Sequence, residues 1–169
     1  MNKHTALIRE MILYENHCPQ RVHHFLKVYS FAKQIAEMEE IDQAQKYTLE
    51  TAAIVHDIGI RESFKKYGKC NGKLQEKEGP YIAKPILRKL GFDENVIERV
   101  CYLIAHHHTY TNVDGIDYQI LLEADFLVNI LEDDLSSKAS VNVLANVFKT
   151  KTGIEFFNSM YSQWKVNIE

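Results

Sequence analysis

Two histidines and two aspartates occupy positions where the sequence would otherwise place core residues. His24 lies one helical turn before Val28 on an apolar face, and His56 with Asp57 ends a stripe of leucine and alanine. Asp125 shares a face with the leucine four residues before it and the valine three residues after it. A carboxylate on such a face is costly to bury unless it meets a cation. Imidazole and carboxylate together suit Zn, Fe, Mn and similar divalent ions, so a metal site is one interpretation of this set.

Three consecutive histidines, His106 to His108, form a second group, and helical phase separates them. His107 and His108 continue apolar stripes, whereas His106 follows a polar one. By the same phase, His24 faces a core and its neighbour His23 faces solvent. A histidine that ends an apolar stripe is also typical of a hydrogen-bonded core residue, and a buried aspartate can cap a helix or pair with a lysine. Spacing alone therefore leaves metal binding and a structural role both open.

Helices must position these side chains. Of the 169 residues only three are proline and seven are glycine, and no stretch sustains an alternation of apolar and polar residues. We therefore expect an all-α fold, with one domain over residues 1–169 built as a bundle of about seven or eight helices and the metal site between helices. The polar, lysine-rich stretch Arg61–Lys77 is expected to be a loop with room for short helical turns, and residues 109–116 are expected to be a second loop. The expected helices are 3–16, 20–40, 42 to about 59, 80–90, 93–108, 117–132, 137–149 and 152–165, with the C-terminal helices 137–165 packed on the core.

Charge and cysteine content exclude several classes of protein. The net charge is −3 with acidic and basic residues interspersed, so neither polymeric nucleic acid nor an anionic membrane is expected as a partner. Three widely spaced cysteines without a CxxC pair make a disulfide framework unexpected and fit a reducing cytoplasm. No signal peptide or stretch of about 18 apolar residues is present, so we expect a cytoplasmic protein. A homo-oligomer is compatible with these features.

Three segments of the sequence resemble the HD-domain superfamily of metal-dependent phosphohydrolases. They are HFLKV from His24, AAIVHDIG with the doublet His56-Asp57, and LLEADFLVN around Asp125, and the resemblance spans about residues 20–130. The resemblance implies an all-α bundle in which His24, His56, Asp57 and Asp125 hold one divalent ion (Mn, Fe, Ni, Zn or Mg). It also implies hydrolysis of a phosphate ester, often a nucleotide, by a metal-activated water. Asp57 would then be catalytic as well as a ligand, because it can orient that water.

The sequence departs from members of the family that hold two metals. Such members add a histidine before a glycine-led helix, and that position is Gln75 here, a poor ligand beside imidazole. Further histidines before the final aspartate are present, with His107 at the best-matching position and His108 next to it. One metal is therefore favoured over two. His107, a candidate catalytic residue, would then contact the substrate phosphate or a bound water.

The expected entrance to the site carries charged residues. A phosphate needs cationic partners, and Arg61 and Lys65 follow the His-Asp doublet closely enough to serve. Glu78 is a candidate general base, and Glu76 lies near the same entrance. Solvent exposure is the alternative for all four. The expected substrate is a small phosphorylated metabolite or nucleotide.

Two other functions fit the same residues. A mixed-valent di-iron oxygenase uses the same scaffold in some relatives, but it needs a fuller histidine set than Gln75 allows. A non-catalytic metal-binding or signalling module would bind metal without turning over a phosphate ester. Iron content with oxygen-dependent turnover would indicate the former, and metal binding without hydrolysis would indicate the latter.

Overall fold

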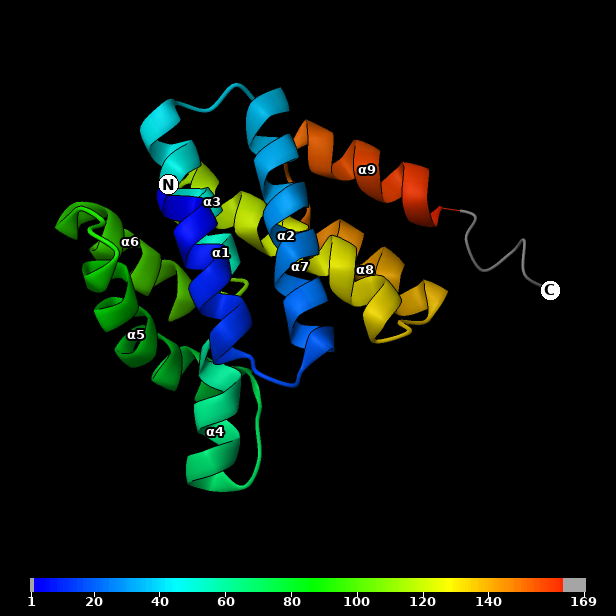
Figure 1. The fold of residues 1–169 in the computed structure, drawn as a ribbon. Helices are drawn as coiled ribbons and strands as arrows, with labels where there is room; N and C mark the ends of the chain where they lie inside the picture. Colours follow the sequence, from blue (N-terminus) through cyan, green and yellow to red (C-terminus); the bar gives the residue numbers. More distant parts are fainter. Residues whose placement is uncertain (1, 163–169) are drawn as a thin grey trace.

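A computed structural model describes residues 2–162 of the chain, and in that range it contains nine α-helices and no strand (Figure 1). The all-α fold expected from the sequence is confirmed. The helices are α1 Lys3–Tyr14, α2 Pro19–Met38, α3 Gln43–Val55, α4 Gly59–Tyr67, α5 Gly72–Lys89, α6 Glu94–Ile104, α7 Ile116–Glu132, α8 Ser137–Val147 and α9 Lys151–Tyr161.

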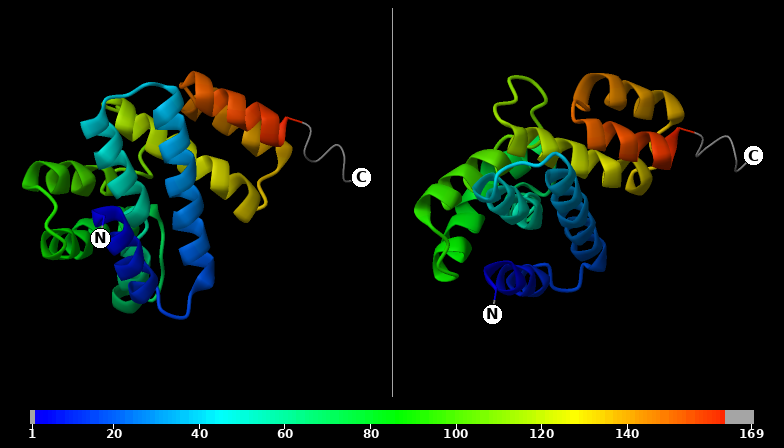
Figure 2. Two further views of the ribbon diagram at one scale, coloured as in Figure 1. Left: turned by 45° about the horizontal axis from the view of Figure 1, so that its top comes forward. Right: turned by 90° about the horizontal axis from the view of Figure 1, so that it is seen from above.

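The centre of the bundle consists of α2, α3 and α7. Helix α2 packs along both α3 and α7, and α3 also contacts α1, α6 and α7. Figures 1 and 2 show α5 and α6 at one end of the molecule, with α8 and α9 side by side at the other. The core is dense, because side chains such as Ile35, Leu49 and Leu121 are fully buried among these helices. Polar residues of α2 and α7 that lie next to this core, and those directly after α3, therefore come close to one another.

Local signals start and stop several helices where the sequence indicates. Pro19 takes the first helical position of α2, and the Asp42 side chain accepts hydrogen bonds from the N–H groups of Ala44 and Gln45 at the start of α3. At the end of α5, Gly91 adopts a φ of 74° and donates to the Arg88 carbonyl. These caps fix the ends of the helices that position the site.

Three of the sequence expectations are wrong, and one is the helix over 93–108, which ends at Ile104 and leaves His106 to His108 in the turn that follows. The stretch Arg61–Lys77 is not a loop, because it contains most of α4 and the start of α5, which also explains why nine helices are present rather than seven or eight. Its polarity belongs to an exposed helix, where Glu62 lies 3.8 Å from Lys65 and 3.6 Å from Lys66. The expected third helix is also too long. It ends at Val55, and a turn over residues 56–58 leads into α4.

The C-terminal helices are tied to α7 by a buried carboxylate. Glu123 is fully buried and accepts hydrogen bonds from the backbone N–H groups of Lys149 (2.6 Å) and Thr150 (2.9 Å), just before α9 begins. Gly153 permits this contact, because a Cβ there would lie 1.9 Å from a Glu123 carboxylate oxygen. The expected helix over 152–165 ends at Tyr161, and its residues 163–165 lie outside the described part of the chain.

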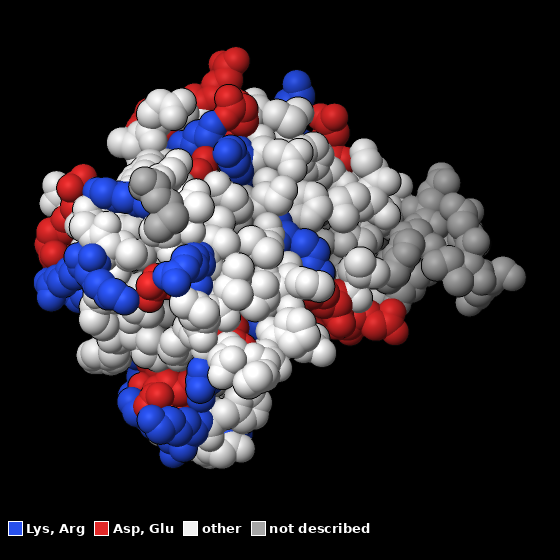
Figure 3. Space-filling model, in the orientation of Figure 1, with Lys and Arg blue, Asp and Glu red and all other residues white. Residues whose placement is uncertain are grey.

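The surface of the molecule mixes charges of both signs. On the face in Figure 3, basic and acidic side chains alternate, with a denser group of basic atoms at the lower end, over α4. Among the described residues, no helix combines the length and apolar character needed to cross a bilayer.

Candidate metal centre

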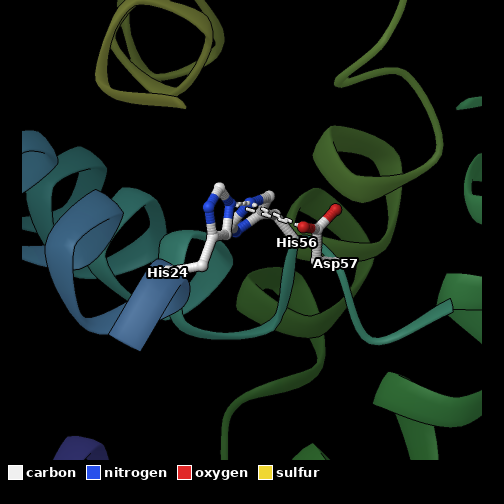
Figure 4. A group of neighbouring side chains, drawn as sticks. All are labelled: His24, His56 and Asp57. Atoms are coloured by element: carbon white, nitrogen blue, oxygen red, sulfur yellow. Dashed lines mark hydrogen bonds and ion pairs between the residues drawn. The ribbon is translucent and has the colours of Figure 1, made fainter. Parts of the chain in front are cut away.

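Four side chains from three regions of the bundle converge on one point. His24 comes from α2, His56 and Asp57 from the turn after α3, and Asp125 from the middle of α7. The Nε2 atom of His24 lies 3.1 Å from Nε2 of His56, 3.4 Å from Oδ2 of Asp57 and 3.2 Å from Oδ1 of Asp125. The Nε2 atom of His56 lies 3.6 and 3.5 Å from the same two oxygens. Figure 4 shows the two rings and the Asp57 carboxylate turned toward one another.

Three imidazoles, those of His24, His56 and the nearby His107, are oriented by a contact at their Nδ1 atoms. The Nδ1 atom of His56 donates to the Ala53 carbonyl at 2.9 Å, and Nδ1 of His107 donates to the Ile104 carbonyl at 2.8 Å. The Nδ1 atom of His24 lies 2.7 Å from a carboxylate oxygen of Glu132. Carbonyl and carboxylate oxygens only accept, so each neutral ring carries its proton on Nδ1 and presents a lone pair at Nε2.

The residues present fit a metal ion. Lone pairs of two imidazoles and two carboxylates face one another, an arrangement that needs a cation between them. Asp125 Oδ1 is buried and accepts no hydrogen bond from the described part of the chain, although two imidazole nitrogens are near. Ligands about 2.1 Å from an ion lie about 3.0–3.4 Å from their neighbours in octahedral or tetrahedral sites, close to the spacing seen here. His24, His56, Asp57 and Asp125 could therefore hold a divalent ion.

The charge state of the metal-free cluster agrees with this interpretation. Burial alone would lower the pKa of His24, but Asp125, Asp57 and Glu132 outweigh it and raise that pKa to about 9. Burial would raise the pKa of Asp57 and of Asp125, yet the surrounding imidazoles hold both well below the usual range. Without metal, a proton on His24 thus supplies the positive charge that the two carboxylates require.

A second group lies beside the first and shares Asp57. His107 is buried, and its Nε2 atom lies 3.3 Å from Oδ1 of Asp57. The ring of His108 lies against that of His107, with centroids 4.0 Å apart and planes inclined by 43°, and its Nε2 atom lies 2.8 Å from the side-chain oxygen of Gln75. Burial and then His107 lower the pKa of His108 to about 4, so that ring is neutral. Asp57, His107 and His108 are close enough to form a second metal-binding group, in which Gln75 already occupies one nitrogen of His108.

The other expected site residues have partners elsewhere. Arg61 donates to the Tyr14 carbonyl and stacks over the Tyr14 ring at 5.5 Å, and Lys65 is exposed beside Glu62. Glu78 accepts from Lys66 at 2.6 Å and Tyr67 at 2.7 Å, which joins α5 to α4. These hydrogen bonds keep the pKa of Glu78 low, which is unfavourable for a general base.

Glu76 holds the segment that follows α6. One of its carboxylate oxygens accepts from the His108 backbone N–H at 3.1 Å and from the Thr109 hydroxyl at 2.9 Å. Its Oε2 atom lies 3.4 Å from the exposed Lys73. Glu76 therefore positions the histidine run and is not a solvated surface residue.

The two histidines expected to face away from the site do so. His23 is exposed on α2, and Nδ1 of His106 lies 2.7 Å from the Tyr102 carbonyl. Two residues near the cluster were missed from sequence. Glu132, which contacts His24, lies two helical turns after Asp125, and that spacing was the available signal. Arg21 lies one turn before His24 and forms an ion pair with the buried Glu15.

The sequence pattern of the HD domain family matches residues 21–136, which include all four converging side chains. The chain belongs to the HD-domain family. Among solved structures, a predicted HD superfamily hydrolase from an uncultured Thermotogales bacterium is similar, with a TM-score of 0.65 and 24% sequence identity, over 96% of this chain and 86% of that one. At this identity the likeness concerns the fold, an HD-domain bundle of helices. No curated protein matches the sequence.

Proposed function

We propose that this HD-domain protein is a metal-dependent phosphohydrolase that cleaves a small phosphate ester and holds one divalent ion between His24, His56, Asp57 and Asp125. The observation that carries the proposal is the convergence of these donors, with Asp125 Oδ1 buried and without a hydrogen bond from the described chain. Membership of the HD-domain family supports the same chemistry.

The two aspartates have different parts in this proposal. A bound divalent ion would lower the pKa of a water ligand and neutralise charge that develops on the phosphoryl group. The Asp125 side chain is only 7% exposed, which suits a ligand that stays fixed. The Asp57 side chain is 21% exposed, so Asp57 can also contact an incoming water and orient it. Burial would lower the pKa of His107, but Asp57 outweighs it and raises that pKa. A protonated His107 would donate its Nε2–H to the other oxygen of Asp57, 3.3 Å away, and keep this carboxylate in position.

The proposed substrate is a small phosphorylated metabolite or a nucleotide. Its phosphate would need cationic partners near the cluster. Arg21 is one candidate, because it lies on the same face of α2 as His24 and only its Nε is engaged by Glu15. Arg61 remains a second candidate. Its guanidinium lies at the end of α1, where Tyr14 holds it.

One experiment tests the proposal and separates it from the alternatives. Purified protein is stripped with a chelator and reloaded with Mn, Fe, Ni, Zn or Mg. It is then assayed with p-nitrophenyl phosphate, bis(p-nitrophenyl) phosphate and a nucleotide panel. We expect at least one ion to support hydrolysis by the wild type and by His23→Ala, but not by His56→Ala, because His56 faces the cluster and His23 is exposed.

Two other outcomes would contradict the proposal. Tight metal binding without hydrolysis of any ester would indicate a non-catalytic binding module. Two irons per chain with oxygen-dependent turnover would indicate a di-iron oxygenase. The contact between Gln75 and His108 stands against a di-iron site. Gln75 engages a ring nitrogen of His108, beside the place where a second iron would bind.

A further inference from the structure

The ring of His24 lies between two carboxylates of a single helix, one near each of its nitrogens. Asp125 Oδ1 lies 3.2 Å from its Nε2 atom, and Glu132 Oε2 lies 2.7 Å from its Nδ1 atom. Asp125 and Glu132 are seven residues apart on α7, so two helical turns bring them onto the same face. His24 itself belongs to α2, and the contact therefore joins the two central helices across the site.

Glu132 is placed where a carboxylate is otherwise unfavourable. It is the last residue of α7, at the end of the helix that carries the partial negative charge. Two cationic or donor groups compensate there, the Nδ1–H of His24 and the ammonium group of Lys27, which contacts the other carboxylate oxygen. Both partners come from α2, three residues apart, and they hold Glu132 in one orientation.

His24 differs in this respect from the other two imidazoles of the site. His56 and His107 each donate Nδ1–H to a main-chain carbonyl three residues earlier in their own segment. Among these three, only His24 donates its Nδ1–H to an anionic side chain, which makes the Nε2 lone pair a stronger ligand for a cation. A carbonyl acceptor is fixed by the backbone, whereas Glu132 can be removed by substitution.

We propose that Glu132 is a positioning residue for the metal ligand His24, which it fixes in the Nδ1–H tautomer so that the Nε2 lone pair points at the ion. Lys27 supports Glu132 from the opposite side. The proposal rests on the proposed function only in requiring that the cluster bind a divalent ion. It concerns affinity and coordination, and it does not depend on which ester is hydrolysed.

The test measures metal binding by full-length wild type and variants that have been stripped of metal. Co²⁺ affinity is obtained by competition with a chelator, and the visible absorption of bound Co²⁺ reports its coordination. For Glu132→Ala we expect affinity to fall by about 10- to 100-fold, with an altered Co²⁺ spectrum, because His24 loses its orienting acceptor. For Glu132→Gln we expect a smaller loss and a spectrum near that of the wild type, since an amide oxygen can still accept from Nδ1–H.

Asp133→Asn is the matched control. It removes one negative charge from the neighbouring residue, which is exposed and caps the end of α7, and it should bind Co²⁺ as the wild type does. Equal affinity and equal spectra for the wild type, Asp133→Asn and Glu132→Ala would overturn the role of Glu132 alone. If Glu132→Ala does not fold, Co²⁺ affinity is measured for Glu132→Gln and Lys27→Met instead. Wild-type affinity in both variants would overturn the positioning role of Glu132. A wild type that binds no Co²⁺ would overturn the proposed function itself.

Discussion

Asp57 and Asp125 face the same pair of imidazoles, but their surroundings differ, and we expect them to have different tasks. Asp125 is enclosed by the bundle, and both imidazole nitrogens lie within 3.5 Å of its Oδ1 atom. Asp57 divides its two oxygens between the cluster and His107, and it stays partly exposed. Removing either charge should therefore affect metal binding and turnover to different extents.

Asp57→Asn should separate these two effects. The amide keeps one oxygen of similar position but removes the charge that attracts the ion and accepts from water. We expect hydrolysis to fall by at least ~100-fold, the scale typical of lost general-base assistance, while metal binding persists more weakly through the other three ligands. Asp125→Asn should instead lose most of the metal. The measurement is turnover together with metal content, and equal behaviour of the two variants would contradict the division of tasks.

Gln75 should determine how many ions bind. Its side-chain oxygen lies 2.8 Å from Nε2 of His108, beside the group formed by Asp57, His107 and His108. We expect Gln75→His to raise the metal content of saturated protein from about one to about two ions per chain, because imidazole is the better ligand. Gln75→Ala, which removes the amide without adding a ligand, should remain at about one. Metal analysis that gives about one ion for Gln75→His would contradict this expectation.

Helical phase predicts orientation for single residues but not their partners. The exposure of His23 and the burial of His24 follow from the apolar stripe on α2. His107 is buried as its phase suggested, but it lies in the turn after α6, so a continuous helical stripe is not the reason for its burial. The contact between His24 and Glu132 could not be predicted, because it depends on how α7 crosses α2 in space. The two-turn spacing places Glu132 on the same face of α7 as Asp125, but it does not indicate which residue of α2 Glu132 meets.

At the scale of elements, the long apolar helices were predictable and the short polar one was not. The stripes of α2, α3, α6 and α7 mark buried faces, whereas α4 is stabilised mainly by its contact with α5 and has few apolar positions. The polar, lysine-rich composition of Arg61–Lys77 suggested a loop, but Gly68 is the C-terminal cap of α4 and Asn71 is the N-terminal cap of α5. Composition alone does not distinguish a capped, exposed helix from a loop.

The crossing of α4 and α5 requires a glycine directly after the His-Asp turn. A Cβ at Gly59 would lie 2.5 Å from the Gln75 carbonyl oxygen and 2.9 Å from the Gly79 nitrogen, and backbone atoms cannot yield easily. We expect Gly59→Ala to destabilise the metal-free protein by about 1–3 kcal/mol in urea unfolding. Gly79→Ala is the control, since its Cβ would have no neighbour closer than 3.7 Å. Equal stability of the two variants would show that the crossing is looser than described.

At the scale of the whole molecule, a bound ion would join α2, α7 and the turn that ends α3. We expect chelation to lower the melting temperature, because an ion that binds only the folded state adds about 2.7 kcal/mol at 100 times its dissociation constant. For a chain of this size that corresponds to roughly 5–10 °C. His56→Ala should show no such metal-dependent shift. An unchanged melting temperature for the wild type after chelation and reloading would argue against a site that bridges the central helices.

The central claim is that His24, His56, Asp57 and Asp125 hold one cation, and anomalous diffraction tests it most directly. Crystals of Mn²⁺-loaded protein, measured at the absorption edge of that metal, locate the ion without reference to activity. We predict one strong peak among these four side chains, with ligand atoms about 2.0–2.3 Å from it. A peak elsewhere on the surface, or none at the cluster in protein that binds Mn²⁺ in solution, would contradict the claim.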